Sequence, residues 1–488
     1  MHRLFALVTA TLFLFATAGC APLAITPSSA APAAMTDAAG VSNLVPGRFI
    51  VVYANGTIPT TTASNTGSTL TQNLTRFGLA VVQSNPADDA TTYARLATQP
   101  GIAYVLRDRY ITGHQISISP APPATDADRY YRSPQNWAVI QAGGFGAGTP
   151  GGPTNGPWNL TRGADTRIAI LDSGVDATHP DIAPNLVFNR SEIDPAALPS
   201  PCDDASPQDQ AGHGTWTASL AAAAAGPTTG GVIGVAPQAS ILNIKILERL
   251  PATSGADLAS RCVNGTTGGL LSWVVQGIDD AIAAKANVIS LSLGAIVDLN
   301  SGDGAGWKAT FDSVTHTANA AGIVIVAAAG NEGLNLSAGT YIELPAQARD
   351  VLPVTASTNP ACAETTSPSA PCVAGPVTRP YYSNYGARLN AIAGPGGSYP
   401  NISDTGTNGF IRGACSTSGC FNLGSQPYVQ AMGTSASAPL VAGAAALLHA
   451  AHPAWTATQI TAALRLSAVT VPGMAEPLLN LPGAISLP

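Results

Sequence analysis

Short, nearly uninterrupted apolar runs alternate with longer mixed segments over most of the chain. The apolar runs predict β-strands at residues 167–171, 240–247, 288–293 and 323–329. The segments between them predict helices at residues 215–225, 270–285 and 307–321. Strands that are apolar on both faces lie between covering helices, so this alternation predicts an α/β domain with a mainly parallel central sheet. Active groups of such sheets gather beyond the carboxyl ends of the strands.

A smaller domain is predicted ahead of this one. Residues 46–53 and 101–108 are strand-like, and a short helix is predicted for 88–98, where an acidic pair begins the segment. Two strands and a helix in roughly 70 residues indicate a small α+β domain, which we place at residues 45–114. Pro, Ala and Asp dominate the next stretch, so residues 115–129 are expected to form an exposed linker of the kind where nicking concentrates.

The N-terminus has the pattern of an export signal. A positive start and an apolar run at residues 4–18 are too short to span a bilayer, and predict a signal peptide at residues 1–19. The sequence Thr17-Ala18-Gly19-Cys20 resembles a bacterial lipobox, which predicts lipidation of Cys20 and a cell-envelope lipoprotein. Leu is usual where Thr17 stands, so plain signal cleavage and secretion are the alternative. Residues 20–44, rich in Ala, Pro and Ser, predict a flexible tether.

Composition narrows the possible partners. The 488 residues are 45% hydrophobic and 10% charged, enough to bury a large core, and the length fits one large domain with a small one. The net charge of −7 includes no run of Lys or Arg, so nucleic acid is not expected as a partner. We expect a monomer.

The cysteines favour disulfide bonds. Besides Cys20 the chain has an even number of them, which in an exported protein predicts three bridges. Six cysteines allow fifteen connectivities. Proximity in the sequence favours Cys362–Cys372 and Cys415–Cys420, which leaves Cys202 with Cys262. Zinc binding is the alternative, but no C-x-x-C pair or His cluster accompanies these residues.

One serine lies at the predicted mouth of a buried helix. The sequence Gly433-Thr434-Ser435 leads into the apolar, Ala-rich run at residues 440–449. The unpaired N–H groups of a helix N-terminus stabilise negative charge, including that of an oxyanion. Pro439 is expected in the first turn, where its missing N–H does not matter. Alone, this stretch could equally be a loop that caps a core helix.

Three other motifs give the serine possible partners. A nucleophilic serine needs a base, and that base needs an acid to fix its tautomer. Asp172 ends a predicted strand in Asp-Ser-Gly, His213 lies in Gly-His-Gly-Thr, and Asn331 lies in Ala-Gly-Asn-Glu-Gly. Each residue alone has a structural explanation, namely a strand-end turn, a helix cap or a tight turn.

Together, in the order Asp, His, Asn, Ser, these motifs resemble those of the subtilisin-like serine peptidases, peptidase family S8. The segments Gly234–Pro237, Ser292–Gly294 and Ser383–Gly386 add to the resemblance, which covers residues 130–488. It implies a three-layer fold and an endopeptidase that acts on proteins or peptides without a cofactor. Ser435 would be the nucleophile, His213 the base and then the acid, and Asp172 the orienting carboxylate. Asn331 and the Ser435 N–H would form the oxyanion hole.

Residues 45–114 resemble, more weakly, the inhibitor-type propeptide of these enzymes. The resemblance implies an intramolecular inhibitor that assists folding of the slow, non-local parallel sheet and is then cut away in the linker. An unrelated N-terminal binding domain is the alternative.

The resemblance also suggests a substrate pocket. The segments Ser292-Leu293-Gly294 and Ala328-Ala329-Gly330, both largely apolar, resemble the walls of the S1 pocket. Glu343, before Leu344-Pro345, would lie near its floor, which predicts some acceptance of Lys or Arg at P1 beside large apolar residues. Alternatively, the Glu343 side chain points into solvent.

Calcium is possible but not supported by the sequence. The family often has an Asn-bearing calcium loop after the catalytic histidine, whereas residues 221–231 here are mainly Ala, Gly and Thr. Asp181 could still be a ligand. No metal is needed for the expected chemistry, and we predict no metal site.

Two other classes of function compete with a peptidase. A surface binding protein could use an inactive peptidase scaffold, but such proteins commonly lack one of the catalytic residues, and all four are present here. A lipase or esterase is disfavoured because Ser435 is not in G-x-S-x-G: position 437 is Ser, and the order of the triad differs.

Overall fold

The structure is a computed structural model that describes residues 43–56, 59, 62–114, 117–120, 137–146, 156–225, 231–359, 377–398, 409–420 and 427–488. The predicted signal peptide, the lipidation site Cys20, most of the tether, and Cys362 and Cys372 lie outside the described residues.

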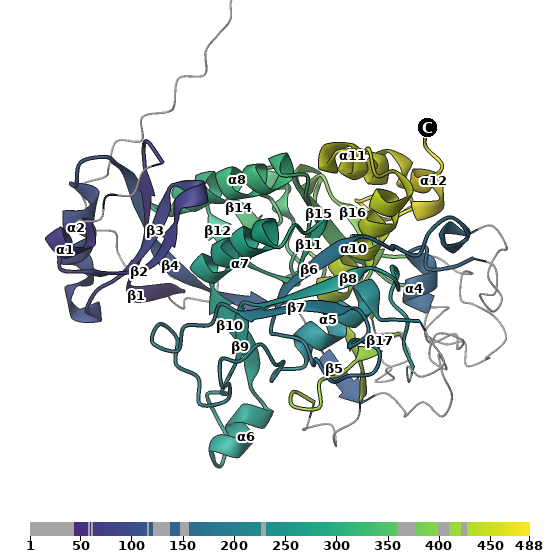
Figure 1. The fold of residues 1–488 in the computed structure, drawn as a ribbon, viewed down its shortest axis with the longest axis horizontal. Coiled ribbons are helices and arrows are strands. Elements are labelled where there is room, and N and C mark those ends of the chain that lie inside the picture. Colours follow the sequence, from purple (N-terminus) through teal and green to yellow (C-terminus); the bar gives the residue numbers. More distant parts are fainter. Residues whose placement is uncertain are drawn as a thin grey trace, which may run out of the picture. The chain divides into compact units, whose positions relative to one another are not determined.

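A seven-stranded sheet forms the centre of the larger domain (Figure 1). Its strand order is β16-β15-β13-β11-β6-β8-β7, and each of these pairs is parallel. The strands are β6 Arg167–Asp172, β7 Leu186–Ser191, β8 Ser240–Lys245, β11 Val288–Leu291, β13 Val324–Ala328, β15 Val351–Ser357 and β16 Ile392–Pro395. The prediction of a parallel α/β sheet is therefore confirmed.

Helices cover both faces of this sheet. The long ones are α5 His213–Ala222, α7 Leu271–Ala283, α8 Gly304–Ala320, α10 Thr434–Ala451 and α11 Ala457–Ser467. Alternate residues of a strand point to opposite faces. Ile168 and Ile170 of β6 accordingly belong to the core cluster that includes α5 and α10, whereas Ala169 and Leu171 belong to the cluster that includes α7 and α8. The result is a three-layer domain.

Helix α10 runs through the core and begins earlier than the sequence suggested. It starts at Thr434 rather than at residue 440, so Pro439 lies inside the helix and the expectation of a first-turn proline was wrong. Among the described helices, α10 alone is long and apolar enough to cross a membrane, but 83% of it is buried inside the protein. Its small apolar residues therefore serve close packing on all sides.

The N-terminal domain is an antiparallel sheet with one main helix against it. Its elements are β1 Leu44–Tyr53, α1 Thr62–Thr66, β2 Thr69–Leu74, β3 Leu79–Gln83, α2 Asp89–Ala97 and β4 Ile102–Gly113. Phe49, Val51 and Leu96 are central to its own small core. Strand β4 extends beyond this core and enters the larger domain.

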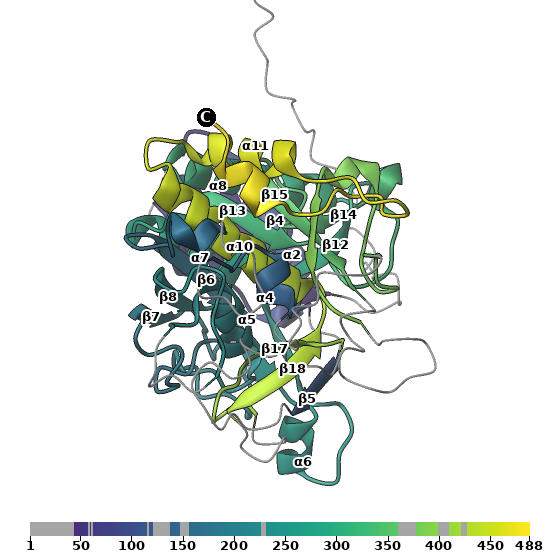
Figure 2. The same ribbon diagram turned by 90° about the vertical axis from the view of Figure 1, so that its right-hand side faces the viewer.

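There β4 lies between two further strands. It pairs antiparallel with β10 (Thr266–Leu270) and with β12 (Leu293–Asp298), so the N-terminal sheet continues into an eight-stranded one. Residues 117–120, which fall in the predicted linker, form strand β5 of a three-stranded sheet with β17 and β18 (Figure 2).

The remaining elements are β9 Leu247–Leu250, β14 Tyr341–Leu344, β17 Ile411–Ala414, β18 Tyr428–Met432, α4 Trp137–Gln141, α6 Leu258–Val263 and α12 Leu481–Ile485.

A buried ion pair fixes β4 to the start of α7. Arg48 and Asp108 are both fully buried, and Arg48 Nε donates to Asp108 Oδ2 at 3.0 Å. The other Asp108 oxygen accepts from Ser272 N at 3.1 Å, and thereby satisfies an N–H of the first turn of α7. Since α7 has no side-chain cap of its own, the N-terminal domain supplies the negative charge that this helix end favours.

We expect Asp108→Ala, in a Ser435→Ala background that prevents self-digestion, to reduce the unfolding free energy by about 3–5 kcal/mol. The reason is that the buried Arg48 would lose its hydrogen-bonded carboxylate and keep only the longer ion pair of Nη1 with Asp194, at 3.7 Å. Urea unfolding followed by tryptophan fluorescence measures this, with the exposed Asp88→Ala as the matched control. Equal urea midpoints for the two variants would contradict the prediction.

Candidate active site

Asp172, His213 and Ser435 form one hydrogen-bonded chain at the carboxyl edge of the parallel sheet. Asp172 is the last residue of β6, His213 the first of α5, and Ser435 the second of α10. His213 Nδ1 lies 2.6 Å from Asp172 Oδ1, and His213 Nε2 lies 3.0 Å from Ser435 Oγ. All three side chains are buried. A carboxylate, an imidazole and a hydroxyl in this order can move a proton away from the hydroxyl.

The carboxylate of Asp172 is held by donors besides His213. Ser173 N donates to Oδ1 at 2.7 Å, and Thr217 Oγ1 donates to Oδ2 at 3.1 Å. Because Thr217 lies one turn after His213 on α5, the same helix positions the imidazole and a partner for the carboxylate. The orientation of the pair therefore depends on how α5 begins.

A second buried carboxylate, Asp209, organises the start of α5. Its Oδ1 accepts from Gly212 N at 2.7 Å and from Ser173 Oγ at 2.9 Å, and its Oδ2 accepts from Thr215 N at 2.8 Å. Burial raises the pKa of Asp209, and the hydrogen bonds from Thr215 and Gly212 oppose that rise. Asp209 thus fixes the residues on both sides of His213 without contacting the hydroxyl of Ser435.

Asn331 follows β13 and is held in a single orientation. Its Oδ1 accepts from both Thr434 N and Thr434 Oγ1 at 2.9 Å. With the oxygen engaged in this way, the amide nitrogen is directed to the other side, where Nδ2 donates to the carbonyl oxygen of His114. Ser435 N also donates to that oxygen, at 3.3 Å. Two donors therefore converge on one carbonyl group beside the Ser435 hydroxyl.

The carbonyl group of Ser435 itself has an unusual partner. In a regular helix it would accept from the N–H of residue 439, but Pro439 has none. Ser292 Oγ donates to Ser435 O instead, at 3.0 Å. Ser292 directly follows β11, so the loop after a third parallel strand completes the first turns of α10.

The residues predicted to line the substrate pocket lie around His114. The imidazole of His114 is 3.3 Å from the Glu343 carboxyl group, measured from Nε2 to Oε1. Glu343 is fully buried, so the alternative of a solvent-directed side chain was wrong. The physical reason is the pairing of β14 with β12, which places Glu343 opposite Ile296 and directs its side chain inward.

Glycines in the two predicted walls leave room for the Glu343 carboxyl group. A Cβ at Gly294 would collide with Glu343 Oε1, and a Cβ at Gly330 would lie 3.1 Å from Oε2. Burial raises the pKa of Glu343 well above its ordinary value, and the charge of nearby Glu332 raises it further. Of the other wall residues, Leu293, Ala328 and Ala329 are buried.

Two disulfides brace the loops around the site. The structure joins Cys202 to Cys262 and Cys415 to Cys420, with Cα–Cα distances of 5.4 and 6.0 Å. Proximity favoured the second pair, and the first is the pair that this choice left over. The second disulfide packs directly beneath the residue before His213, since a Cβ at Gly212 would lie 2.9 Å from Cys420 Sγ.

Arg249 connects both disulfide loops to the His213 loop. Its guanidinium donates to Gly419 O at 2.9 Å, to Val263 O at 2.7 Å and to Gln210 O at 3.0 Å, as well as to Cys262 O. The side chain is almost fully buried. One cation thus holds three separate stretches of chain near the site.

No metal cluster is found among the described residues, since they contain no group of three or more His, Cys, Asp or Glu side chains that could hold an ion. Asp181, the possible calcium ligand, accepts from Val232 N at 3.1 Å through Oδ2.

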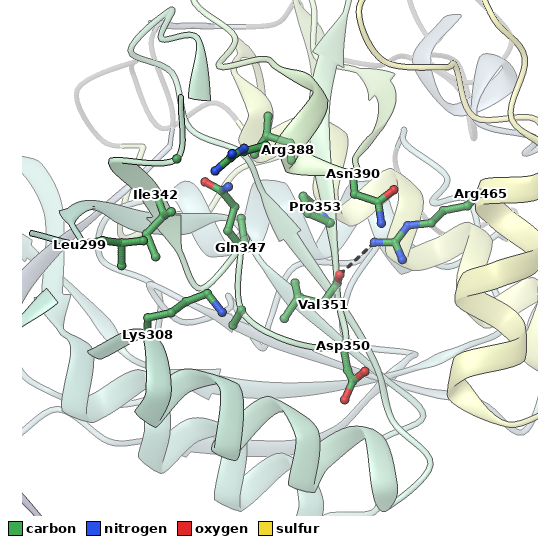
Figure 3. Close-up of a pocket in the computed structure, with 14 residues that line it drawn as sticks. Leu299, Lys308, Ile342, Gln347, Asp350, Val351, Pro353, Arg388, Asn390 and Arg465 are labelled. Atoms are coloured by element: carbon green, nitrogen blue, oxygen red, sulfur yellow. Dashed lines mark hydrogen bonds between the residues drawn. The ribbon is translucent and has the colours of Figure 1, made fainter. Parts of the chain in front are cut away.

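Figure 3 shows a separate pocket of about 450 Å³. Three cationic side chains line it: Lys308, Arg388 and Arg465. Arg465 Nη2 donates to Val351 O at 3.2 Å, and Lys308 pairs with Asp312. No residue of the Asp172–His213–Ser435 chain lines this pocket, so it is separate from the candidate site.

Comparison with known proteins identifies the family. The profile of the subtilase family, Peptidase_S8, matches residues 163–480, which is more than half of the chain. The chain belongs to the subtilase family. The residues that carry the resemblance in the sequence all lie inside the matched range.

Characterised relatives match a similar part of the chain. Subtilisin NAT of Bacillus subtilis subsp. natto is 30% identical over 300 residues, covering 61% of this chain and 59% of the relative. Thermitase of Thermoactinomyces vulgaris is 31% identical over 316 residues, covering 65% and 85%. The match thus spans less than two thirds of the length of the subtilisin.

Two solved structures share the fold over a longer part of this subtilase. Fervidolysin from Fervidobacterium pennivorans, a keratinolytic enzyme related to subtilisin, matches with a TM-score of 0.63 and 21% identity, covering 91% of this chain and 62% of that one. The epidermin leader peptide processing serine protease EpiP from Staphylococcus aureus gives 0.63 and 19%, covering 90% and 97%. The predicted subtilisin-like fold is confirmed.

Three features of the site were not found from the sequence. Asp209 could have been noticed as an acidic residue shortly before a predicted helix, a position that favours carboxylates. The hydrogen bond from Ser292 to Ser435 has no signal in the sequence, because it depends on where α10 begins. The presence of His114 in the site had none either, because it depends on how β4 pairs with another domain.

We expect Ser292→Ala to reduce the unfolding free energy by about 1–3 kcal/mol, because the buried Ser435 carbonyl loses its donor. The cost should be smaller in a Pro439→Ala background, where the new N–H of residue 439 can donate to the same oxygen. Urea unfolding of the four variants in a double-mutant cycle, with surface Ser313→Ala as control, measures the coupling. Equal costs in the two backgrounds would show that the carbonyl does not depend on Ser292.

Proposed function

We propose that the chain is an exported serine endopeptidase that hydrolyses peptide bonds through Asp172, His213 and Ser435. The observation that carries the proposal is the convergence of two N–H donors on a carbonyl oxygen beside a hydroxyl that is hydrogen-bonded to an imidazole. Membership of the subtilase family supports the same reaction class. Its substrates are proteins or peptides, and the chemistry requires no cofactor.

The geometry supports acyl transfer in two halves. His213 Nε2 takes the proton of Ser435 Oγ as this oxygen attacks the substrate carbonyl carbon, and then gives the proton to the departing amine. Asp172 keeps the imidazole in the required tautomer and stabilises its positive form. Water repeats the sequence on the acyl-enzyme and releases the acid product.

Asn331 and the Ser435 N–H act on the oxygen that becomes negative. In the tetrahedral intermediate the substrate oxygen carries a full charge, so donors that are already oriented stabilise the intermediate more than the substrate. Thr434 provides this orientation, since both of its hydrogen bonds go to the Asn331 amide oxygen and so keep the amide nitrogen on the side of the substrate oxygen.

The N-terminal domain acts as an intramolecular inhibitor of the site until it is removed. Support comes from β4, which lies between β10 and β12, where an extended peptide substrate would pair. The Asp108 contact with α7 adds a reason why this domain assists folding of the larger one. Maturation then separates the domain from the remainder of the chain.

Residues 1–20 direct the protein out of the cell in this proposal. Cys20 is the lipid-modified N-terminus of the mature precursor, anchored in a bacterial membrane, and secretion without an anchor is the alternative. Disulfide bonds form and persist mainly outside the cytosol. The bridges Cys202–Cys262 and Cys415–Cys420 therefore support export.

We expect the full-length precursor to shorten within residues 114–130 and to react with a fluorophosphonate probe, whereas Ser435→Ala does neither. Ser437→Ala is the matched control, because this buried serine lies on the same helix and bonds to Gly394 O rather than to His213. Intact mass and in-gel fluorescence report both results. If the wild-type precursor neither shortens nor binds the probe, the peptidase proposal fails, and the alternative of a binding protein on an inactive peptidase scaffold is favoured.

We expect Asn331→Ala to lower kcat by about 10²–10³ with little change in KM, the size of effect seen for the corresponding donor in a subtilisin. Steady-state kinetics on a fluorogenic peptide measure it. Asn319→Ala on α8, whose side chain contacts Thr458, is the control and should retain the parent kcat. A raised KM with unchanged kcat would instead assign Asn331 to substrate binding.

A further inference from the structure

The last residues of the N-terminal domain occupy the position of a bound peptide. Residues 110–112 pair with 268–270 of β10 on one side, and residues 112–113 pair with 293–294 of β12 on the other. His114 N then donates to Ser292 O at 3.0 Å. The His114 carbonyl follows immediately, with the two oxyanion donors on its oxygen.

The residue before this carbonyl lies against the catalytic imidazole. A Cβ at Gly113 would lie 3.4 Å from Cε1 and 3.5 Å from Nε2 of His213, and 2.5 Å from Thr267 Oγ1. Glycine avoids the crowding with Thr267, whereas the distances to the ring of His213 are ordinary van der Waals contacts. A small residue is therefore favoured at this position of a substrate.

The His114 side chain is buried and reaches the carboxyl group of Glu343. The two side chains are only 4% and 1% exposed. Neither oxygen of Glu343 has a hydrogen-bond partner among the described residues, and His114 Nε2 is the nitrogen that the ion-pair distance places beside it. A fully buried carboxyl group is thus directed at the ring of the residue whose carbonyl group the site holds.

We infer that the protein cleaves its own chain after His114, and that Glu343 makes histidine preceded by glycine its preferred substrate. The inference rests on the proposed peptidase function and specifies its substrate. The bond that breaks joins the His114 carbonyl carbon to the nitrogen of Gln115, so Gln115 becomes the new N-terminus.

The atoms of this cleavage balance with one water molecule. Ser435 Oγ bonds to the His114 carbonyl carbon as the bond to the Gln115 nitrogen breaks, and the serine proton reaches that nitrogen through His213. Water then adds to the same carbon as the bond to Ser435 Oγ breaks. One water proton returns to Ser435 Oγ through His213, and the other is lost to solvent from the new carboxyl group, which leaves His114 with a carboxylate.

Histidine fits this pocket better than lysine, arginine or an apolar residue. An imidazole and a carboxyl group can share one proton, either as an ion pair or as a neutral hydrogen bond, so the buried pair needs no net charge. Lysine and arginine are longer fixed cations, whereas His114 Nε2 already lies 3.3 Å from Glu343. Phenylalanine would leave the buried carboxyl group without a partner. Selectivity for histidine thus replaces the preference for Lys or Arg predicted from the sequence.

Self-cleavage is tested on the full-length protein. N-terminal sequencing of the matured fragment should give Gln115, and His114→Lys should slow maturation roughly tenfold or more. His316→Ala, an exposed histidine on α8, is the matched control and should mature at the parent rate. Urea unfolding of His114→Lys in the Ser435→Ala background shows whether that variant folds. A different new N-terminus, or a folded His114→Lys that matures normally, overturns the inference.

Preference in trans is tested with fluorogenic peptides Ile-Thr-Gly-X, where X is His, Lys, Arg, Phe or Ala. The matured enzyme should show the largest kcat/KM for His, and Glu343→Gln should lower the ratio of His to Phe roughly tenfold or more. Glu476→Gln, whose new amide oxygen can still accept from Gly386 N, is the conservative control and should keep the parent ratio. A ratio unchanged by Glu343→Gln, or a preference for Lys, Arg or Phe, overturns the inference.

The two levels of the proposal fail separately. Fluorophosphonate labelling and hydrolysis of denatured casein report peptidase activity without regard to His114 or Glu343. If both are positive and the histidine preference is absent, the inference fails and the peptidase function stands. If neither the label nor casein hydrolysis is found, both fail together.

Discussion

The position of the first turn of α10 is the constraint on which the candidate site depends. This helix is buried among β11, β13 and β15, so its N-terminus can open only at the carboxyl edge of the parallel sheet. The other groups of the site reach the same edge from the ends of separate strands: Asp172 from β6, Ser292 from β11 and Asn331 from β13. Because parallel strands end side by side, residues far apart in the sequence meet around one serine without any long-range loop.

The small side chains of α10 and its internal proline belong to this arrangement. Alanine and glycine allow the helix to lie close to the sheet and to α5, where Gly443 leaves no room for a Cβ beside Val235 and Ala221 O. Pro439 removes one helical bond, and the loop after β11 replaces it through Ser292. The hydrogen bond from Ser292 prevents α10 from rotating about its axis, and packing against the sheet prevents it from sliding along that axis. Together these constraints set the direction of the Ser435 hydroxyl.

The fold and most of the candidate site could be predicted from the sequence. The features that were missed share a physical cause, because each depends on contacts between residues far apart in the chain. The apolar strands, their helices and the residues of the four motifs follow from local patterns, so the fold and the Asp172–His213–Ser435 cluster were within reach. The start of α10 was missed because Thr434 and Ser435 favour caps over helix interiors, and tertiary packing overrides that preference. The burial of Glu343 and the place of His114 depend on β12, β14 and β4 pairing across domains, and no local signal encodes such pairing.

The guanidinium of Arg249 gives the two disulfides a joint effect that neither has alone. It holds the carbonyl oxygens of Val263, next to Cys262, and of Gly419, between Cys415 and Cys420, together with that of Gln210 shortly before His213. Reduction of either bridge lengthens a free loop on one side of this cation, and the added mobility is passed to the imidazole. How firmly the structure holds the His213 imidazole therefore depends on whether these two disulfides are formed.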